Sequence, residues 1–166
     1  MNVQEFVEDI LHREKIRFEV FHHEPVYTME QAALVCGHRP EEGVKTLMIR
    51  TYKTKSQYDF ALVVWRGDRQ VNWNHIATEL NVKKVSMASE DEVEQTLGIK
   101  IGALTPFGYT QKLPVIFDKA ILENTTAYIN PGRHDETLQL ASGDLFAAIH
   151  SWLGHDGMIV MMTSSD

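Results

Sequence analysis

The sequence predicts a single α/β domain, residues 1–166, with a curved, mixed β-sheet and helices around it. Three observations support this prediction. Segments with the alternating pattern of strands interleave with segments that have the 3.6-residue pattern of helices. Several strand pairs are joined too tightly for helical crossovers, so parallel and antiparallel neighbours should both occur. A chain of 166 residues has the length of one domain, and it contains no repeat, linker or low-complexity segment.

The first quarter of the chain predicts two helices separated by a strand. Val3 to Lys15 has apolar residues at the spacing of an amphipathic helix, and Ile16 to Phe21 then alternates as a strand does. A second helix should begin after an N-cap at Thr28, with Gln31 at the capping-box position, and end at Gly37.

The middle of the chain predicts a hairpin followed by helices and a short strand. Val44 to Tyr52 and Tyr58 to Trp65 are apolar, β-rich runs joined by a short polar turn. Val71 to Leu80 should be a strand end leading into a helix, and a short strand from Val82 to Met87 should follow. Ser89 has the pattern of an N-cap whose capping-box partner lies three residues later, which predicts a helix to Leu97.

The last part of the chain predicts three strands and a closing helix. Pro114 to Asp118 reads as a buried strand, and Thr126 to Ile129 and Thr137 to Leu140 as strands on either side of a turn. A helix should run from an N-cap at Ser142 to Leu153. The Met158 to Met162 tail is either a short terminal strand or a frayed end.

Composition restricts the location and the partners of the protein. One cysteine, Cys36, excludes an internal disulfide framework and fits a reducing compartment, and the N-terminus lacks a signal-peptide pattern, so we expect a cytoplasmic protein. No apolar run approaches the ~18 residues of a membrane span. A net charge of −7 argues against a protein that coats DNA or other nucleic acid, although a few local cations could still hold a single-stranded end.

The sequence lacks the common signatures of side-chain catalysis. No His-x-x-x-His or Cys-x-x-Cys pattern predicts a metal site, and no Gly-x-Ser-x-Gly motif predicts a serine hydrolase. Neighbouring carboxylates occur only in runs typical of surfaces, among them Asp135-Glu136. We therefore identify no protein nucleophile, no strong candidate base and no metal or cofactor.

The segment from Gly98 to Gly108 is the most unusual stretch of the chain. It contains three glycines and one proline between apolar residues, and neither a helix nor a strand period fits it. Gly102 and Gly108 permit positive φ, while Pro106 fixes its own φ and restricts Thr105. Such a loop can present backbone N–H groups to a carbonyl oxygen or a phosphate.

Two further segments complete a recognisable set. In Glu42 to Arg50 a single lysine, Lys45, opens a buried strand, and Asn130 to Leu140 is a turn that runs into an alternating strand. In this order and spacing, the three segments resemble the YbaK/EbsC-type aminoacyl-tRNA deacylases, the family that includes the editing domain inserted in bacterial prolyl-tRNA synthetases. The resemblance covers the chain from about His23 to about Leu145.

The resemblance implies a trans-editing deacylase that hydrolyses the ester of a mischarged tRNA without a metal or cofactor. Its partners would be the aminoacylated acceptor end of tRNA and, in addition, an aminoacyl-tRNA synthetase. The family's catalytic lysine falls on Lys45 and its glycine loop on Gly102, with Ala103 and Leu104 following. These groups would act with assistance from the substrate's own ribose hydroxyl, so that no side-chain base is needed.

The resemblance also implies the residues that bind the substrate. Pro106 and Phe107 would shape the far side of the glycine loop, with Phe107 either packing beneath it or contacting the amino acid. His23 and Tyr27 align with a segment that lines the pocket in relatives.

The third segment matches the family less completely. Asn130, Gly132 and Arg133 match the family turn. Thr137 occupies a position where some members place an aspartate that contacts the substrate amino group. The amino acid that is removed is therefore left open.

Two alternatives remain beside the deacylase. The chain could be a non-catalytic module of the same fold that binds a tRNA end, an amino-acid derivative or a partner protein, since a fold does not determine a function. Hydrolysis or lysis of a small thioester or sulfur compound is a weaker alternative. The deacylase interpretation requires the Lys45 ammonium and the amides near Gly102 to meet at one solvent-accessible hollow.

Overall fold

The predicted α/β class with mixed strand pairing is correct, but the strands form two sheets instead of one. The computed structural model describes residues 2–154 and 157–161. A three-stranded antiparallel sheet has the order β1 (Phe18–His22), β7 (Glu136–Ala141), β6 (Thr126–Ile129). A five-stranded sheet has the order β4 (Lys84–Met87), β2 (Val44–Tyr52), β3 (Tyr58–Arg66), β5 (Val115–Asp118), β8 (Met158–Met161). In the larger sheet β2 is antiparallel to β3 and β4, whereas β5 is parallel to β3 and β8.

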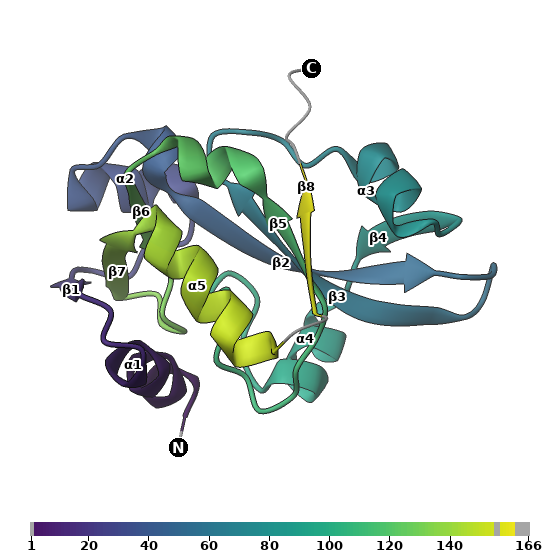
Figure 1. The fold of residues 1–166 in the computed structure, drawn as a ribbon, viewed down its shortest axis with the longest axis horizontal. Coiled ribbons are helices and arrows are strands. Elements are labelled where there is room, and N and C mark those ends of the chain that lie inside the picture. Colours follow the sequence, from purple (N-terminus) through teal and green to yellow (C-terminus); the bar gives the residue numbers. More distant parts are fainter. Residues whose placement is uncertain (1, 155–156, 162–166) are drawn as a thin grey trace.

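The helices cover these sheets as Figure 1 shows. They are α1 (Val3–Arg13), α2 (Met29–Cys36), α3 (Trp73–Leu80), α4 (Glu90–Leu97) and α5 (Ser142–Leu153), with 3₁₀ turns η1 (Pro40–Glu42) and η2 (Lys119–Glu123). Helix α5 contacts α1, β6, β7 and β8, so it fills the space between the two sheets. No helix among the described residues is long and apolar enough to span a membrane.

Strand β3 lies at the centre of the fold and is buried on both faces. Leu62 and Val64 belong to the larger core, together with residues of α1, α5 and the Gly98–Gly108 loop. Val63 and Trp65 belong to a smaller core under α3. Because both faces are covered, the strand reads in the sequence as a continuous apolar run without alternation.

Two glycines join the sheets next to the start of β2. Gly43 forms an isolated bridge with Tyr128 of β6, and its carbonyl oxygen accepts a 2.7 Å hydrogen bond from the Gly67 amide. A Cβ on Gly43 would lie 2.6 Å from the Met29 Cε, and one on Gly67 would lie 2.9 Å from the Gly43 oxygen. This close approach places β6 directly beside the first residues of β2.

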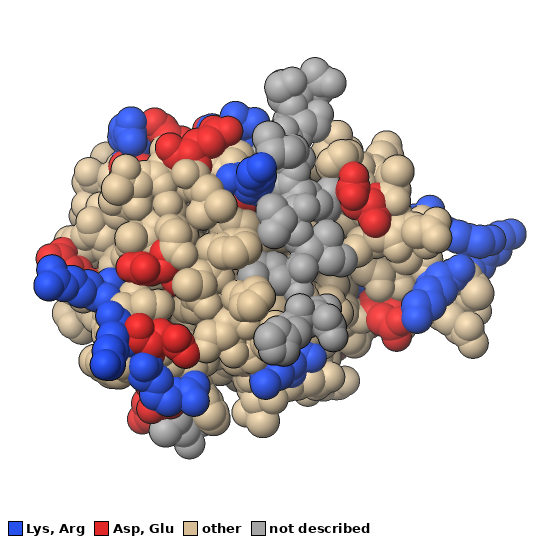
Figure 2. All heavy atoms as spheres, viewed as in Figure 1, with Lys and Arg blue, Asp and Glu red and all other residues tan. Residues whose placement is uncertain are grey.

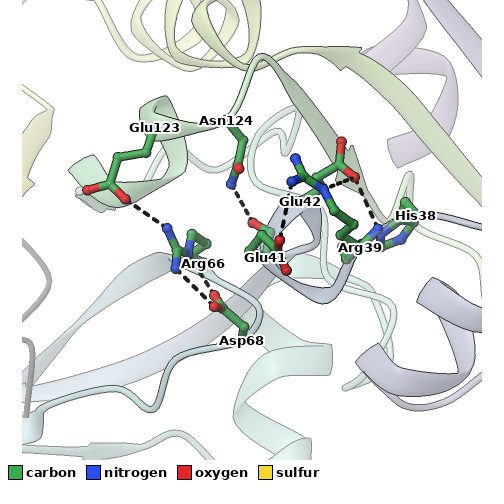
Figure 3. A network of polar contacts seen from close by, with 8 residues as sticks. All are labelled: His38, Arg39, Glu41, Glu42, Arg66, Asp68, Glu123 and Asn124. Carbon is green, nitrogen blue, oxygen red and sulfur yellow. Dashed lines mark hydrogen bonds and ion pairs between the residues drawn. The ribbon is translucent and has the colours of Figure 1, made fainter.

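A network of ionic and polar contacts, drawn in Figure 3, connects η1, the end of β3 and η2 next to the start of β2. Arg66 at the end of β3 donates to Asp68 at 2.7 and 2.9 Å and to Glu123 at 2.9 Å. Asn124 donates its side-chain amide to the Glu41 carbonyl at 2.7 Å, and thereby ties η2 to the turn before β2. These contacts hold η2, the end of β3 and the turn before β2 together.

The predicted helix caps are confirmed at two sites and wrong at a third. Thr28 accepts the Gln31 amide at 3.1 Å, and Ser89 forms a complete capping box in α4. Ser142 is the first residue of α5, and the N-cap is Ala141. The Ser142 hydroxyl donates instead to the Asn124 carbonyl. This contact connects the start of α5 to the turn before β6.

The C-terminal tail contains a strand, which is one of the two structures expected for it. Met158–Met161 form β8, which pairs in parallel with β5, while Met162 lies outside the described residues.

The surface charge is mixed on the face shown in Figure 2, with basic side chains gathered at the tip of the β2–β3 hairpin. This tip carries Lys53 and Lys55, and Lys53 pairs with Asp59 at 3.1 Å.

Candidate active site

A cavity of about 240 Å³ opens where the start of β2 meets β6, α2 and the Gly98–Gly108 loop. Its apolar lining comes from Val26, Met29, Ala32, Val44, Leu47, Ile101, Leu104 and Ile129. Its polar lining comes from Tyr27, Thr28, His38, Lys45, Thr46, Gly102, Tyr128, Asn130, Glu136 and Thr137. A hollow that combines apolar walls with converging polar groups is typical of a site for a small ligand group.

Lys45 reaches this cavity from the second position of β2, opposite Trp65 of β3. Its side chain is half-buried, and its ammonium donates a hydrogen bond to the Arg69 carbonyl. Burial lowers the pKa of Lys45 below its usual value, and the negative charges of Asp68 and Asp118 oppose this shift only in part. A partly desolvated ammonium interacts more strongly with an anion than one in water does.

The Gly102 loop brings backbone amides to the same cavity. Gly102 has φ +88°, and its carbonyl accepts a 3.3 Å bond from the Asn130 side-chain amide. The Ala103 amide donates to the Lys100 carbonyl at 3.1 Å. The amides of Gly102 and Leu104 make no hydrogen bond within the described part of the chain. These two residues line the cavity, so their N–H groups, and not that of Ala103, are the candidates for donation to a ligand.

Asn130 connects the turn after β6 to the glycine loop. Its side-chain oxygen accepts the amides of Gly132 at 2.8 Å and Arg133 at 3.0 Å, which closes the turn after β6. Its amide nitrogen makes the bond to Gly102. A single side chain thus couples the third sequence segment to the glycine loop.

Thr137 and His23, both candidates from the sequence, are hydrogen-bonded to each other. The His23 Nδ1 lies 2.8 Å from the Glu24 carbonyl, which only accepts, so Nδ1 carries the proton. In the neutral ring Nε2 is then an acceptor, and the Thr137 hydroxyl donates to it at 2.9 Å. The lone pairs of the Thr137 oxygen remain to accept a hydrogen bond from a ligand in the cavity.

Glu136 was placed wrongly in a surface run by the sequence argument. It is 8% exposed and lines the cavity, where its carboxylate accepts from the Gln4 side chain and lies 3.2 Å from the His22 Nδ1. The missed signal was its alternation with Leu138 and Leu140, which puts all three on the buried face of β7. This carboxylate is engaged by α1 and β1.

Other lining residues also escaped the sequence argument. Met29 and Ala32 come from α2, and a stacked pair of rings, His38 and Tyr128, lies at a centroid distance of 4.0 Å. Their roles depend on how α2 docks against β6, which no local pattern encodes.

Several residues expected to bind substrate lie outside the cavity lining. Pro106 and Phe107 are buried in the core, so Phe107 packs beneath the loop. Gly132 lies in the turn after β6, where a Cβ added to it would face Ile99 and Val3 and not the cavity. The Arg133 guanidinium is exposed and makes two hydrogen bonds to Asp135, at 2.8 and 2.9 Å.

The arrangement can polarise a carbonyl with backbone amides and an ammonium. No group of three or more His, Cys, Asp or Glu side chains within the described ranges is placed to hold a metal ion.

Comparison with known proteins decides the family. Residues 23–148 match the aminoacyl-tRNA editing domain. The chain belongs to this family. The matched range contains β2, the glycine loop and the turn after β6, and so includes every residue that lines the cavity.

Curated relatives of this editing-domain chain include two similar in length to it. It is 30% identical over 135 residues to the prolyl-tRNA editing protein ProX of Acetoanaerobium sticklandii, covering 79% of this chain and 80% of the relative. It is 26% identical over 136 residues to the multifunctional Ser/Thr-tRNA deacylase ProXp-y of Escherichia coli K12, covering 81% of each. It also matches the proline–tRNA ligase of Bacillus subtilis at 32% identity, covering 70% of this chain but 23% of the ligase.

Solved structures share the fold. A protein proposed to be a trans-editing enzyme for prolyl-tRNA synthetase superimposes with a TM-score of 0.80 at 18% identity, covering 98% of this chain and 96% of the other. The hypothetical protein APE2540 gives a TM-score of 0.78 at 22% identity, covering 93% of this chain and 96% of the other.

Proposed function

We propose that this protein is a trans-editing aminoacyl-tRNA deacylase that hydrolyses the ester between a mischarged amino acid and the terminal ribose of a tRNA. The observation that supports the proposal most is that Lys45 and the loop residues Gly102 and Leu104 line one cavity. The names of the two relatives similar in length point to the same reaction class. The substrate would be met in the cytoplasm, where charged tRNAs are used.

The reaction needs little from the protein because the ester is already activated. Water attacks the ester carbon, the carbonyl oxygen gains negative charge, and the bond to the ribose oxygen then breaks as that oxygen takes a proton. The amides of Gly102 and Leu104, with Lys45, would stabilise the oxyanion. The neighbouring ribose hydroxyl would orient the water and relay its proton to the departing ribose oxygen, which fits a cavity whose lining carboxylate, Glu136, is engaged elsewhere.

Thr137 would contribute an acceptor for the substrate amino group, because its own proton is donated to His23. Thr137→Val removes the hydroxyl without changing the shape of the side chain. We expect KM to rise by about tenfold, the cost of one buried hydrogen bond to a charged group. Steady-state kinetics of deacylation check this, with Thr137→Ser as the variant that keeps the hydroxyl. Equal kinetics for Thr137→Val and the wild type would remove Thr137 from the site.

The function itself is tested by a panel of tRNAs, each charged with a different amino acid. We expect release of at least one small amino acid at a rate well above spontaneous hydrolysis. The matched negative control is the same protein with Lys45→Ala. A protein that binds tRNA but cleaves no member of the panel would instead be a binding module of the same fold.

An aminoacyl-tRNA synthetase is the second proposed partner. The match to a proline–tRNA ligase covers only part of that enzyme, so the editing unit there is one segment of a longer chain. A separate chain with the same fold would obtain its substrate either from a synthetase or after release. Co-purification with prolyl-tRNA synthetase in the presence of tRNA measures which route operates.

A further inference from the structure

Tyr27 is an exposed aromatic side chain on the rim of the candidate active site. It lines the cavity and is nevertheless 68% exposed. Two hydrogen bonds hold its backbone: the Tyr27 amide donates to the Gln31 side chain at 2.9 Å, and the amide of the preceding residue, Val26, donates to the His134 carbonyl at 2.9 Å. A fixed backbone thus presents a largely solvent-facing ring.

The ring of Tyr27 is continued by a second ring. His134 lies at a centroid distance of 4.7 Å from it, with an interplanar angle of 35°. The His134 Nε2 lies 3.3 Å from the position that a Cβ on Gly102 would occupy. The two rings therefore extend from the glycine loop outward along the mouth of the cavity.

The two aromatic rings lie where the terminal nucleobase of the substrate is expected, at the mouth of the cavity. If the ester carbonyl accepts hydrogen bonds from the Gly102 and Leu104 amides, the ribose that carries the ester lies at the opening of the cavity. The base attached to that ribose then lies just outside. Aromatic rings stack on nucleobases without needing a charged contact, which fits a chain of net charge −7.

We propose that Tyr27, supported by His134, is the stacking platform for the terminal adenine base of the substrate tRNA. This inference rests on the proposed function, because it assumes that the ester enters the cavity. It assigns the exposed ring to the nucleotide and not to the amino acid.

The test compares two esters of the same amino acid in the hydrolysis assay. One is the aminoacyl ester of adenosine, and the other is the aminoacyl ester of 1-deoxyribose, which has no base. We expect Tyr27→Ala to lower the ratio of their kcat/KM values, adenosine over base-free, by about tenfold. Tyr27→Phe should preserve the ratio, since the Tyr27 hydroxyl makes no hydrogen bond to a residue that the structure describes.

The matched control is Leu34→Ala. Leu34 is 86% exposed on α2, close in sequence to Tyr27, but it does not line the cavity. Its substitution removes exposed apolar surface without removing a ring, so the ratio should not change. An unchanged ratio in Tyr27→Ala, or a parallel fall for both esters, would overturn the proposal, because the ring would then serve the acyl group or nothing.

A binding measurement separates this inference from the proposed function. Chemical-shift titration with AMP, against ribose 5-phosphate as the ligand without a base, needs no hydrolysis. We expect AMP to bind more tightly than ribose 5-phosphate in the wild type and equally in Tyr27→Ala. If the wild type cleaves no ester but shows this AMP preference, the hydrolase proposal fails and the platform stands. Equal binding of the two ligands by the wild type contradicts the platform whatever the enzyme cleaves.

Discussion

Lys45→Ala is expected to lower kcat/KM for aminoacyl-tRNA hydrolysis by about 10²–10³-fold, the typical effect of losing one group that stabilises an oxyanion. Lys45 lines the cavity, its side chain is half-buried, and its ammonium donates a hydrogen bond to the Arg69 carbonyl. Single-turnover deacylation measures the chemical step without product release. The matched control is Lys53→Ala, because Lys53 is exposed just after the same strand and pairs with Asp59. A Lys45→Ala rate within threefold of the wild type would contradict the assignment.

The pH dependence of Lys45 has a definite sign. Burial lowers its pKa below the usual value of 10.5, so the charged form is lost at a lower pH than in a free lysine. After subtraction of spontaneous hydrolysis, activity should fall as pH rises through this lowered pKa. The Lys45→Ala variant should lack that descending limb.

The same shift predicts the effect of Lys45 on stability. Below the folded-state pKa the ammonium is charged in both states and its desolvation opposes folding in full. The penalty fades as pH rises from that pKa to the usual 10.5, because the unfolded state then binds more protons. Lys45→Met should therefore have an equal or higher melting temperature at pH 7, while activity is lost. A large fall in melting temperature would mean that Lys45 is structural.

Gly102→Ala is expected to reduce activity by about tenfold or more. Gly102 has φ +88°, which a residue with a Cβ adopts at a cost of about 1–2 kcal/mol, and the new Cβ would press on His134 at 3.3 Å. Any relief of this strain moves the amides of Gly102 and Leu104 relative to Lys45. Deacylation rates and melting temperatures of the variant measure the two effects separately.

Gly98→Ala is the control that separates backbone strain from site geometry. Gly98 has φ +69° and caps α4 at the start of the same loop, but no atom lies within 4 Å of its added Cβ. We expect both variants to lose similar stability, and only Gly102→Ala to lose activity beyond that loss. Equal activities of the two variants would show that the amides at Gly102 do not act in catalysis.

The fold could be predicted wherever local patterns were unambiguous. The N-caps at Thr28 and Ser89, the β2–β3 hairpin and the buried β5 strand follow from short-range signals that tertiary contacts did not override. The division into two sheets could not be predicted. It depends on the approach of Gly43 to Tyr128, two residues 85 positions apart whose contact leaves no periodicity in either segment.

The candidate site was predicted in its three segments but not in its details. Lys45, Gly102, Leu104, Asn130 and Thr137 do line one cavity. The sequence could not show that the Ala103 amide is occupied by the Lys100 carbonyl, because hydrogen-bond partners in a loop depend on its actual dihedral angles. Nor could it show that Arg133 turns outward to Asp135.

By itself, the sequence determined the α/β class, the order of the elements and the three segments that carry the candidate chemistry, because each depends on neighbouring residues in the chain. Tertiary structure alone decided which groups meet. The docking of β6 against the start of β2 brings Asn130 to Gly102. The pairing of β1 with β7 brings His23, the residue after β1, to Thr137 of β7. Convergence of this kind is a property of packing between distant segments, which local propensity does not record.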